Sequence, residues 1–314
     1  MHTFISDADF QSVFDRCQQN VDLKTLTTVK TGGVAKWLFR PQNEEELLKI
    51  LAFAQKNGKP YFVLGEGSNC LASDDGYSGI LIKLSPYFCQ ISFDGDLVVA
   101  DAGAKTSMLS AFCLKYQLSG AEFMASIPAS IGGATVMNAG CYGQCMADCV
   151  EMVQAVNPCG TKYFDKSQLG FGYRESVFLN SDYVVTKVFF KFRQKPRELV
   201  LQRMKNIALA KKSSQPLTKP SFGSVFKRNP TGLAPAEMID ALGFKGFAFN
   251  GAKVSEKHAG FFVNDNHATT NDFLMLIDIV GQKVKGQYGV LLNAEVRYLG
   301  DKDDLGRLPY THDL

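Results

Sequence analysis

Strand-like and helix-like segments alternate over residues 37–84, and this alternation constrains the fold more than any other feature of the chain. Strands are predicted at 37–40, 61–64 and 80–84. After the first strand, Asn43 stands three residues before Glu46, the spacing of a helix cap, and apolar residues then recur with helical period as far as Gly58. The first 84 residues therefore predict a small α/β unit.

The rest of the chain carries more strand signals and several helices. Two hairpins are predicted at 91–100 and 150–164, and further strands at 183–192, 260–263 and 290–299. Helices are predicted at 107–117, 197–212, 235–242 and 272–287, with a short amphipathic helix at 10–17. Residues 193–197, which include Pro196, predict a linker. The pattern favours an α+β protein with boundaries near residues 84 and 196 and a tail over 301–314.

Composition and charge argue against several classes of binding partner. A formal net charge of +3 argues against nucleic acid or an anionic membrane as the main partner. No stretch approaches the roughly 18 apolar residues of a membrane span, and the acidic N-terminus is unlike a secretory signal. The eight cysteines lack a disulfide-scaffold spacing, and the three at 141, 145 and 149 lack the second hook of a zinc ribbon. We therefore expect a cytoplasmic protein with free thiols and no metal.

Two glycine-rich segments are candidates for a cofactor site. The first follows a predicted strand, and its polar turn consists of Gly65, Gly67, Ser68 and Asn69 around Glu66. Backbone N–H groups in such a turn can converge on a phosphate, although a plain turn explains the residues equally well. The dinucleotide fingerprint G-x-G-x-x-G does not occur.

The second segment spans residues 126–143 and is rich in small residues bounded by apolar ones. Its candidate cofactor contacts are Pro128, Ala129, Ser130, Gly132, Gly133, Asn138 and Gly140. A backbone with so few large side chains can lie against a flat isoalloxazine ring or a pyrophosphate. The alternative is a tight crossover between packed elements.

Three further residues carry reactive chemistry. Ser224 stands between Pro220 and Pro230, which predict a shaped loop rather than a helix or strand, with Lys227 and Arg228 just after it. Arg174 lies in an aromatic setting that suits a grip on a carboxylate. Glu295 is an acid in an apolar strand, which is costly unless it is paired or protonated. The bland alternatives are a solvated turn for Ser224 and structural ion pairs for the other two.

Taken in order, six segments resemble the UDP-N-acetylenolpyruvoylglucosamine reductase (MurB) family over residues 26–300. They are VLGEGSN (63–69), IPASIGGATVMNAGCYG (127–143), FGYRESVF (171–178), PSFGSVFKRNP (220–230), VSEKHAGFFVN (254–264) and LLNAEVRYLG (291–300). The resemblance implies a two-part FAD-binding domain of the vanillyl-alcohol-oxidase/PCMH type at 1–84 and 85–196, then a substrate-binding domain at 197–300.

The family reaction would use NADPH to reduce non-covalently bound FAD, which then passes hydride to the enolpyruvyl group of a UDP-sugar, giving UDP-N-acetylmuramate. By this resemblance Arg174 and Glu295 would hold the substrate carboxylate and the developing enolate, and Ser224 would give the proton. Substrate contacts would come from Tyr173, Lys227, Arg228, Asn229 and His258. The short stretch between the predicted strand 183–192 and Gln215 leaves no room for the extra loop of one subclass, so the chain resembles the shorter, second type of the family. We expect a monomer.

Two departures from the family pattern affect the site. Ala129 stands where the family often has glycine, and Arg228 precedes Asn229, which leaves open which of the cations and Asn229 meets the pyrophosphate. Two rival functions also remain at this point. One is a flavin oxidase of the same broad group, and the other is a non-catalytic protein that binds a flavin or a nucleotide sugar.

Overall fold

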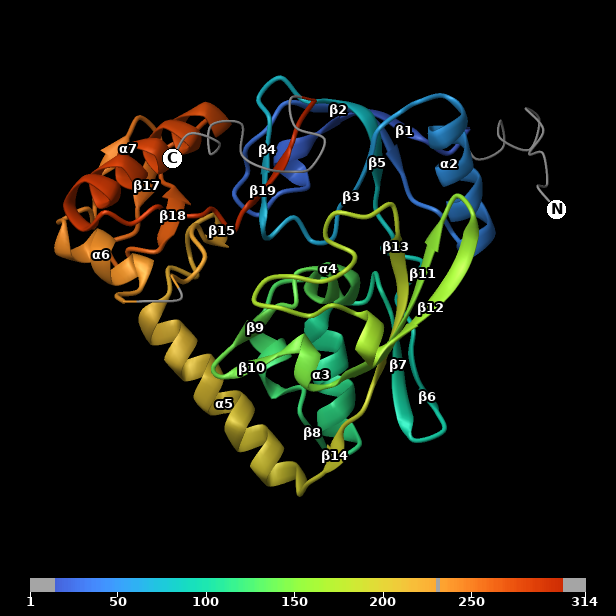
Figure 1. Ribbon diagram of the computed structural model, residues 1–314. Helices are drawn as coiled ribbons and strands as arrows, with labels where there is room; N and C mark the ends of the chain where they lie inside the picture. The colour runs from blue at the N-terminus through green and yellow to red at the C-terminus, as the bar shows by residue number, and fades with distance from the viewer. Residues whose placement is uncertain (1–14, 230–231, 302–314) are drawn as a thin grey trace. The chain divides into compact units, whose positions relative to one another are not determined.

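The computed structural model describes residues 15–229 and 232–301, which form two compact units that interleave along the chain (Figure 1). The first unit takes in 15–19, Trp37–Glu66 and Gly79–Ala210. The second takes in Asn20–Lys36, Gly67–Ser78 and 211–301. The boundary passes between Glu66 and Gly67, so each unit carries half of the first glycine-rich loop.

The described chain begins with the predicted α/β pattern. The sheet has the order β1-β2-β5-β3, with β3 parallel to β5; its strands are β1 (Gln18–Asp22), β2 (Val34–Phe39), β3 (Tyr61–Val63) and β5 (Tyr77–Ile82). Helix α2 (Glu44–Lys56) follows β2, and Asn43 Oδ1 accepts from Glu46 N at 2.9 Å, which confirms the predicted cap. The buried residues of α2 recur at helical spacing, so its apolar face packs into the core.

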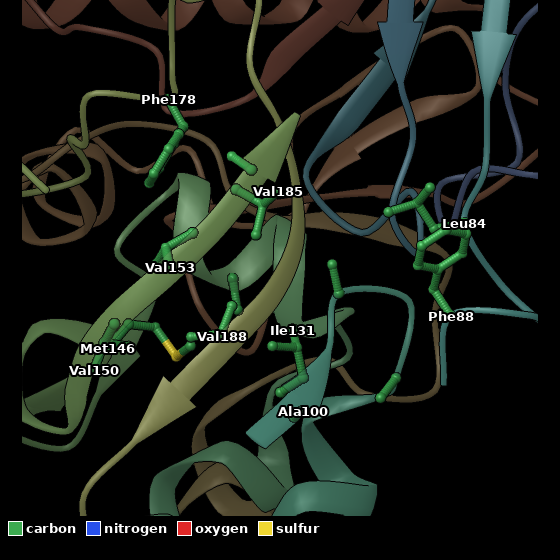
Figure 2. Packing of buried hydrophobic residues seen from close by; sticks show 14 of the residues in the cluster. Leu84, Phe88, Ala100, Ile131, Met146, Val150, Val153, Phe178, Val185 and Val188 are labelled. Atoms are coloured by element: carbon green, nitrogen blue, oxygen red, sulfur yellow. The ribbon is translucent and has the colours of Figure 1, made fainter. Parts of the chain in front are cut away.

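A five-stranded antiparallel sheet of order β12-β11-β13-β7-β6 forms the rest of the first core. Its strands are β6 (Ile91–Asp94), β7 (Leu97–Asp101), β11 (Val150–Asn157), β12 (Gly160–Asp165) and β13 (Val184–Phe190). Figure 2 shows Val150, Val153 and Val188 of this sheet gathered with Ile131 and Met146, all buried in one hydrophobic cluster. Ile131 begins the short helix α4, so this packing fixes the start of that helix.

Shorter elements complete the first unit. They are α3 (Thr106–Lys115), α4 (Ile131–Val136), the pairs β8 (Leu118–Ser119) with β14 (Arg193–Gln194) and β9 (Gly140–Cys141) with β10 (Gln144–Cys145), and the 3-10 turns η2 (Glu122–Ser126), η3 (Met146–Asp148) and η4 (Lys166–Gln168). Helix α5 (Arg197–Ser214) leads on from this unit, and the change of unit falls between Ala210 and Lys211 within it.

The second unit is built on the sheet β15-β18-β17-β16 and two helices. The elements are η1 (Leu23–Thr25), β4 (Cys70–Ala72), β15 (Ser221–Ser224), α6 (Pro235–Ala241), β16 (Ala248–Phe249), β17 (Ala252–Val254), β18 (Phe261–Asn264), α7 (Thr270–Tyr288) and β19 (Arg297–Leu299). Strands β4 and β19 pair in parallel, and the paired residues Cys70 and Arg297 lie 227 positions apart in sequence. Phe222 packs edge-on against Phe273 of α7 at 5.3 Å between ring centroids, which ties β15 to the core.

Four expectations from the sequence need correction or fall outside the described residues. The predicted strand 290–299 is wrong for 290–296, because only Arg297–Leu299 pairs as a strand. The segment Pro220–Pro230 is also not all loop, since Ser221–Ser224 forms β15. The predicted helix at 10–17 lies mostly outside the described residues, as does the tail after Asp301. Among the described residues, no helix combines the length and apolar character needed to cross a membrane.

Candidate active site

The first half of the glycine-rich loop follows β3 and lies against the second loop. Leu64 extends the pairing of β3, its N–H donating to Ile82 O at 2.8 Å. A Cβ on Gly65 would lie 2.6 Å from Ser130 Oγ, so a side chain here would collide with the second loop. Gly65 therefore brings the two predicted cofactor loops of the first unit together.

Two lysines bring positive charge to this loop. Lys83 Nζ donates to the Gly65 carbonyl and lies 3.4 Å from Glu66 Oε1, while Lys105 Nζ lies 3.7 Å from Glu66 Oε2. Burial lowers the pKa of Lys83, and the neighbouring Glu66 partly opposes the shift. Lys83 was not among the predicted site residues, although it is the single lysine within the apolar strand predicted at 80–84.

The second loop is held from one side by Thr106 at the start of α3. Thr106 N donates to Ala129 O at 3.0 Å, and Thr106 Oγ1 donates to Ile127 O at 2.6 Å. Pro128, between these two anchored residues, is exposed. The loop is therefore held by hydrogen bonds from Thr106 to its carbonyls and by the packing of Ile127 and Ala129 against the first core.

The glycines that follow already use their amides within the protein. Gly132 N donates to Ala102 O at 2.8 Å, and Gly133 N donates to Ser130 Oγ, the cap of α4, at 3.2 Å. A Cβ on Gly132 would lie 2.8 Å from Ala102 Cβ. Gly132 is thus required for close packing between α4 and β7, and neither amide is left over for a phosphate.

Arg174 lies in a tight turn with left-handed backbone. Gly172 and Glu175 exchange backbone hydrogen bonds of 3.1 and 3.3 Å across it, and Arg174 has φ +57°. Left-handed backbone is uncommon for residues other than glycine and tends to occur where function needs it. The guanidinium donates to Gly140 O at 3.3 Å and lies 5.0 Å from the ring centroid of Tyr173.

Asn138 connects the second loop to the turn of Arg174. Its Nδ2 donates to Gly172 O at 2.7 Å, and its Oδ1 accepts from Ala147 N at 3.0 Å. Asn138 is buried, with φ +40°. Its side chain therefore supports the backbone that presents Arg174, and Gly140 contributes an acceptor to the same arginine.

Ser224 lies at the end of β15 in the second unit. The strand pairs with β18 across a bulge, with Ser221 opposite Val263 and Ser224 opposite Phe261, and Gly223 between them has φ +86°. The half-buried Ser224 hydroxyl donates to Phe226 O at 3.4 Å, a long hydrogen bond. The bulge and this weak bond leave the hydroxyl available for another partner.

The apolar neighbours of Ser224 anchor its segment. Phe222, Val225 and Phe226 are buried in the second core, while Arg228 is exposed and Lys227 and Asn229 are half-buried. The core side chains thus hold the backbone while polar residues between and after them remain accessible.

The backbone of Glu295 runs beside this segment. Glu295 N donates to Val225 O at 2.7 Å, and Lys227 N donates to Asn293 O at 2.8 Å. An isolated bridge joins Phe226 to Ala294 between these bonds. The structure therefore brings two of the three predicted catalytic residues, Ser224 and Glu295, onto adjoining backbones within the second unit, while Arg174 lies in the first.

The remaining predicted residues of the second unit support these segments. Gly67 has φ +66°, and its carbonyl accepts from Thr28 N at 3.1 Å. Thr28 Oγ1 also donates to Ser221 O at 2.6 Å, a link to β15 that the sequence did not signal.

His258 has one ring nitrogen already engaged. Its Nδ1 accepts from Gly260 N at 3.1 Å, and its ring packs edge-on against Phe261 at 5.0 Å. Burial lowers the pKa of His258. A neutral ring with Nδ1 as acceptor carries its proton on Nε2, which is then the nitrogen able to donate to a ligand. Among the described residues, no group of His, Cys, Asp and Glu side chains is arranged to hold a metal ion.

Comparisons with known proteins match two segments of the chain to two domain families. The family "FAD binding domain" matches residues 35–163, and "UDP-N-acetylenolpyruvoylglucosamine reductase, C-terminal domain" matches residues 215–299. These matches confirm the predicted α+β class with a FAD-binding domain ahead of a second domain. The reductase of that name from Syntrophomonas wolfei is 38% identical over 93% of this chain and 100% of its own length.

A second relative and a solved structure extend the likeness. The UDP-N-acetylenolpyruvoylglucosamine reductase of Lactiplantibacillus plantarum is 38% identical over 90% of this chain and 94% of its own length. The crystal structure of the Thermus caldophilus reductase superposes with a TM-score of 0.78, at 33% identity, over 90% of this chain and 99% of that one. The chain therefore belongs to the UDP-N-acetylenolpyruvoylglucosamine reductase family.

Proposed function

We propose that this chain is an FAD-dependent UDP-N-acetylenolpyruvoylglucosamine reductase that uses NADPH to convert UDP-N-acetylglucosamine enolpyruvate into UDP-N-acetylmuramate for peptidoglycan synthesis. Family membership over nearly the whole chain supports the reaction. The observation that carries the residue assignment is the 2.7 Å bond from Glu295 N to Val225 O, which sets an acid beside the segment of Ser224.

The residues of the first unit fit a flavin nucleotide. Gly65 and Gly132 leave no room for side chains at the contact between loop and helix, and Lys83 and Lys105 supply positive charge near a pyrophosphate. We assign the holding of FAD to Gly65, Gly67, Ser68, Asn69 and to the loop of Pro128, Ala129 and Ser130. Gly132, Gly133, Asn138 and Gly140 would act mainly by shaping that site, because their amides or neighbours are bonded internally.

Bound FAD would supply the hydride chemistry of the reaction, with NADPH as the source of the hydride and the vinyl carbon of the substrate as its destination. Addition of that hydride leaves an enolate next to the existing carboxylate, so the chain must stabilise growing negative charge. We assign this to Arg174, whose strained turn fixes its backbone, and to Glu295, acting as a protonated or hydrogen-bonded acid.

The enolate becomes product when the carbon next to the carboxylate gains a proton. We assign the delivery of this proton to the Ser224 hydroxyl. The O–H bond of serine breaks as the new C–H bond forms, and Lys227 or a water then returns a proton to the serine oxygen. The long internal bond of Ser224 Oγ, 3.4 Å to Phe226 O, costs little to give up for such a transfer.

The two cations that follow β15 could bind the negatively charged UDP pyrophosphate. We assign Lys227, Arg228 and Asn229 to this group, with Tyr173 and the Nε2 side of His258 as further substrate contacts. The free thiols are in keeping with a cytoplasmic enzyme, and we propose that it acts as a monomer on a nucleotide-sugar substrate, without nucleic acid or a membrane as partner.

Visible absorbance of the purified protein tests the proposal. The protein should absorb near ~450 nm, bleach with NADPH under anaerobic conditions, and recover its colour on addition of the enolpyruvyl UDP-sugar. An oxidase would recover with oxygen but not with the sugar, and a non-catalytic binder would not bleach. Protein that stays colourless after incubation with FAD would refute the flavoenzyme assignment.

A further inference from the structure

Glu295 reaches the site from a segment that is not a regular strand, so something other than a sheet ladder must fix its direction. Strand β19 begins only at Arg297, two residues later. The Cα–Cβ direction of a residue is set by the two planar peptide units that flank it. The hydrogen bonds made by the N–H and the C=O of Glu295 therefore fix the direction in which its side chain leaves the backbone.

Both peptide units are anchored, and by different parts of the chain. Glu295 N donates to Val225 O at 2.7 Å, beside Ser224. Glu295 O accepts from the side chain of Asn69, Nδ2 to O 3.1 Å. Asn69 O in turn accepts from Arg297 N at 3.0 Å, so Asn69 spans residues 295–297 with its side chain and its backbone.

Asn69 is itself held in a rigid setting. Cys70, the next residue, starts β4, which pairs in parallel with β19. Two residues earlier, a Cβ on Gly67 would lie 2.1 Å from Leu26 O, so the turn before Asn69 is pressed against residues 26–28. Asn69 is half-buried, which shields its bond to Glu295 from competing water.

We propose that Asn69 is a positioning residue for Glu295: its side-chain amide fixes the peptide after Glu295 and so aims the carboxyl group at the reacting carbons. This inference rests on the role proposed for Glu295, and it assigns Asn69 a task beyond contact with the cofactor. Asn69 would thereby serve both as a contact of the cofactor and as a support for the group that stabilises the enolate.

The structure offers a matched variant and a matched control. Asn69→Asp keeps the size of the side chain but replaces the donor with a carboxylate that repels the Glu295 carbonyl. Asn264 lies in the same unit and has its amide bonded elsewhere, Nδ2 to Val29 O at 3.0 Å and Oδ1 to Ala268 N at 2.8 Å. Asn264→Asp therefore makes the same chemical change without touching Glu295. Asn69→Ala serves if Asn69→Asp fails to fold.

The readout is the ratio of two reoxidation rates measured on FAD-saturated, photoreduced enzyme, one with the enolpyruvyl UDP-sugar and one with oxygen. Oxygen needs no enolate stabilisation, so the ratio corrects for changes in flavin binding or folding. We expect Asn69→Asp to lower the ratio by about 10- to 100-fold, the scale of a misplaced catalytic group, and Asn264→Asp to leave it within about twofold.

A double-mutant cycle with Glu295→Ala then identifies the route of the effect. If Asn69 acts through Glu295, Asn69→Asp should change the ratio by less than about threefold in the Glu295→Ala background. An unchanged ratio in Asn69→Asp, or the same fall in both backgrounds, would overturn the inference and leave Asn69 as a cofactor contact alone. If Glu295→Ala by itself has no effect on the ratio, the proposed role of Glu295 fails, and the positioning role fails with it.

Discussion

Replacing Gly67 by alanine tests how strongly the glycine-rich loop depends on close backbone packing. Gly67 has φ +66°, and Gly289 at the end of α7 has φ +65°, so alanine meets the same backbone strain at both positions. That shared strain costs about 1–2 kcal/mol. The two sites differ in their surroundings, because a Cβ at Gly67 would lie 2.1 Å from Leu26 O and 2.9 Å from Thr27 Cα, whereas nothing lies within 4 Å of a Cβ at Gly289.

The overlap at Gly67 involves backbone atoms that no side-chain rotation can move. Relief requires the loop to shift from residues 26–28, which breaks the hydrogen bonds from Thr28 N and Thr28 Oγ1 to Gly67 O, 3.1 and 3.3 Å long. At about 1 kcal/mol for each bond, Gly67→Ala should lose about 2 kcal/mol more unfolding free energy than Gly289→Ala, or about 3–4 kcal/mol in all.

Urea unfolding of the apoprotein, followed by far-UV circular dichroism, measures both losses without a contribution from bound FAD. Both glycines lie in the second unit, so the same transition reports on them. If the two variants differ by less than about 0.5 kcal/mol, the usual limit for resolving such differences, the close approach does not constrain the loop.

Two further predictions concern titrating groups. At about pH 8 a thiol reagent should label the exposed Cys159 first, while Cys70, Cys113 and Cys149 react only on unfolding, because burial raises the pKa of each thiol, that of Cys70 to about 12; rapid labelling of the buried three in the folded protein would contradict this. Burial lowers the pKa of His258, so below about pH 6.5 the unfolded chain binds a proton more readily than the folded chain does. The free energy of unfolding therefore decreases as the pH is lowered. His258→Gln should therefore lose less unfolding free energy than the parent between about pH 7 and pH 5 in urea titrations, and equal losses would show that His258 does not contribute.

Local signals were sufficient for much of the fold. The cap at Asn43 and the apolar period after it predicted α2 closely, because a helix is specified by residues three and four apart. The hairpin of β11 and β12 was predicted for a similar reason, since its turn residues lie next to the strands they join. The boundaries near residues 84 and 196 stay predictions. The two compact units alternate along the chain, and no local sequence signal indicated this.

The errors arose where backbone partners lie far apart in sequence. Residues 290–296 have the composition of a strand, but their bonds go to residues 225–227 and to Asn69, and no pattern within the segment could indicate those partners. In the segment of Ser224, proline and glycine predicted a loop, whereas pairing with β18 across a bulge makes part of it a strand.

The candidate site shows the same division. Residue types predicted Ser224, Arg174 and Glu295, because few side chains can supply a proton or bind a carboxylate. Asn138 was predicted only as a cofactor contact, and Lys83 and Thr28 were not singled out. The hydrogen bonds that these three residues donate to carbonyls far along the chain are revealed only by the folded structure. The adjoining backbones of Ser224 and Glu295 were likewise beyond reach of the sequence.

The central claim is that Ser224 gives the proton in the second half of the reaction, and rapid mixing of Ser224→Ala tests it most directly. Anaerobic NADPH should bleach the flavin of the variant at close to the parent rate, because no proton from Ser224 is needed for that step. Reoxidation by the enolpyruvyl UDP-sugar should be slower by about 10²- to 10⁴-fold, the usual contribution of a positioned proton donor. Reoxidation of Ser224→Ala within about threefold of the parent rate would contradict the claim, since a donor worth so little is not the catalytic acid.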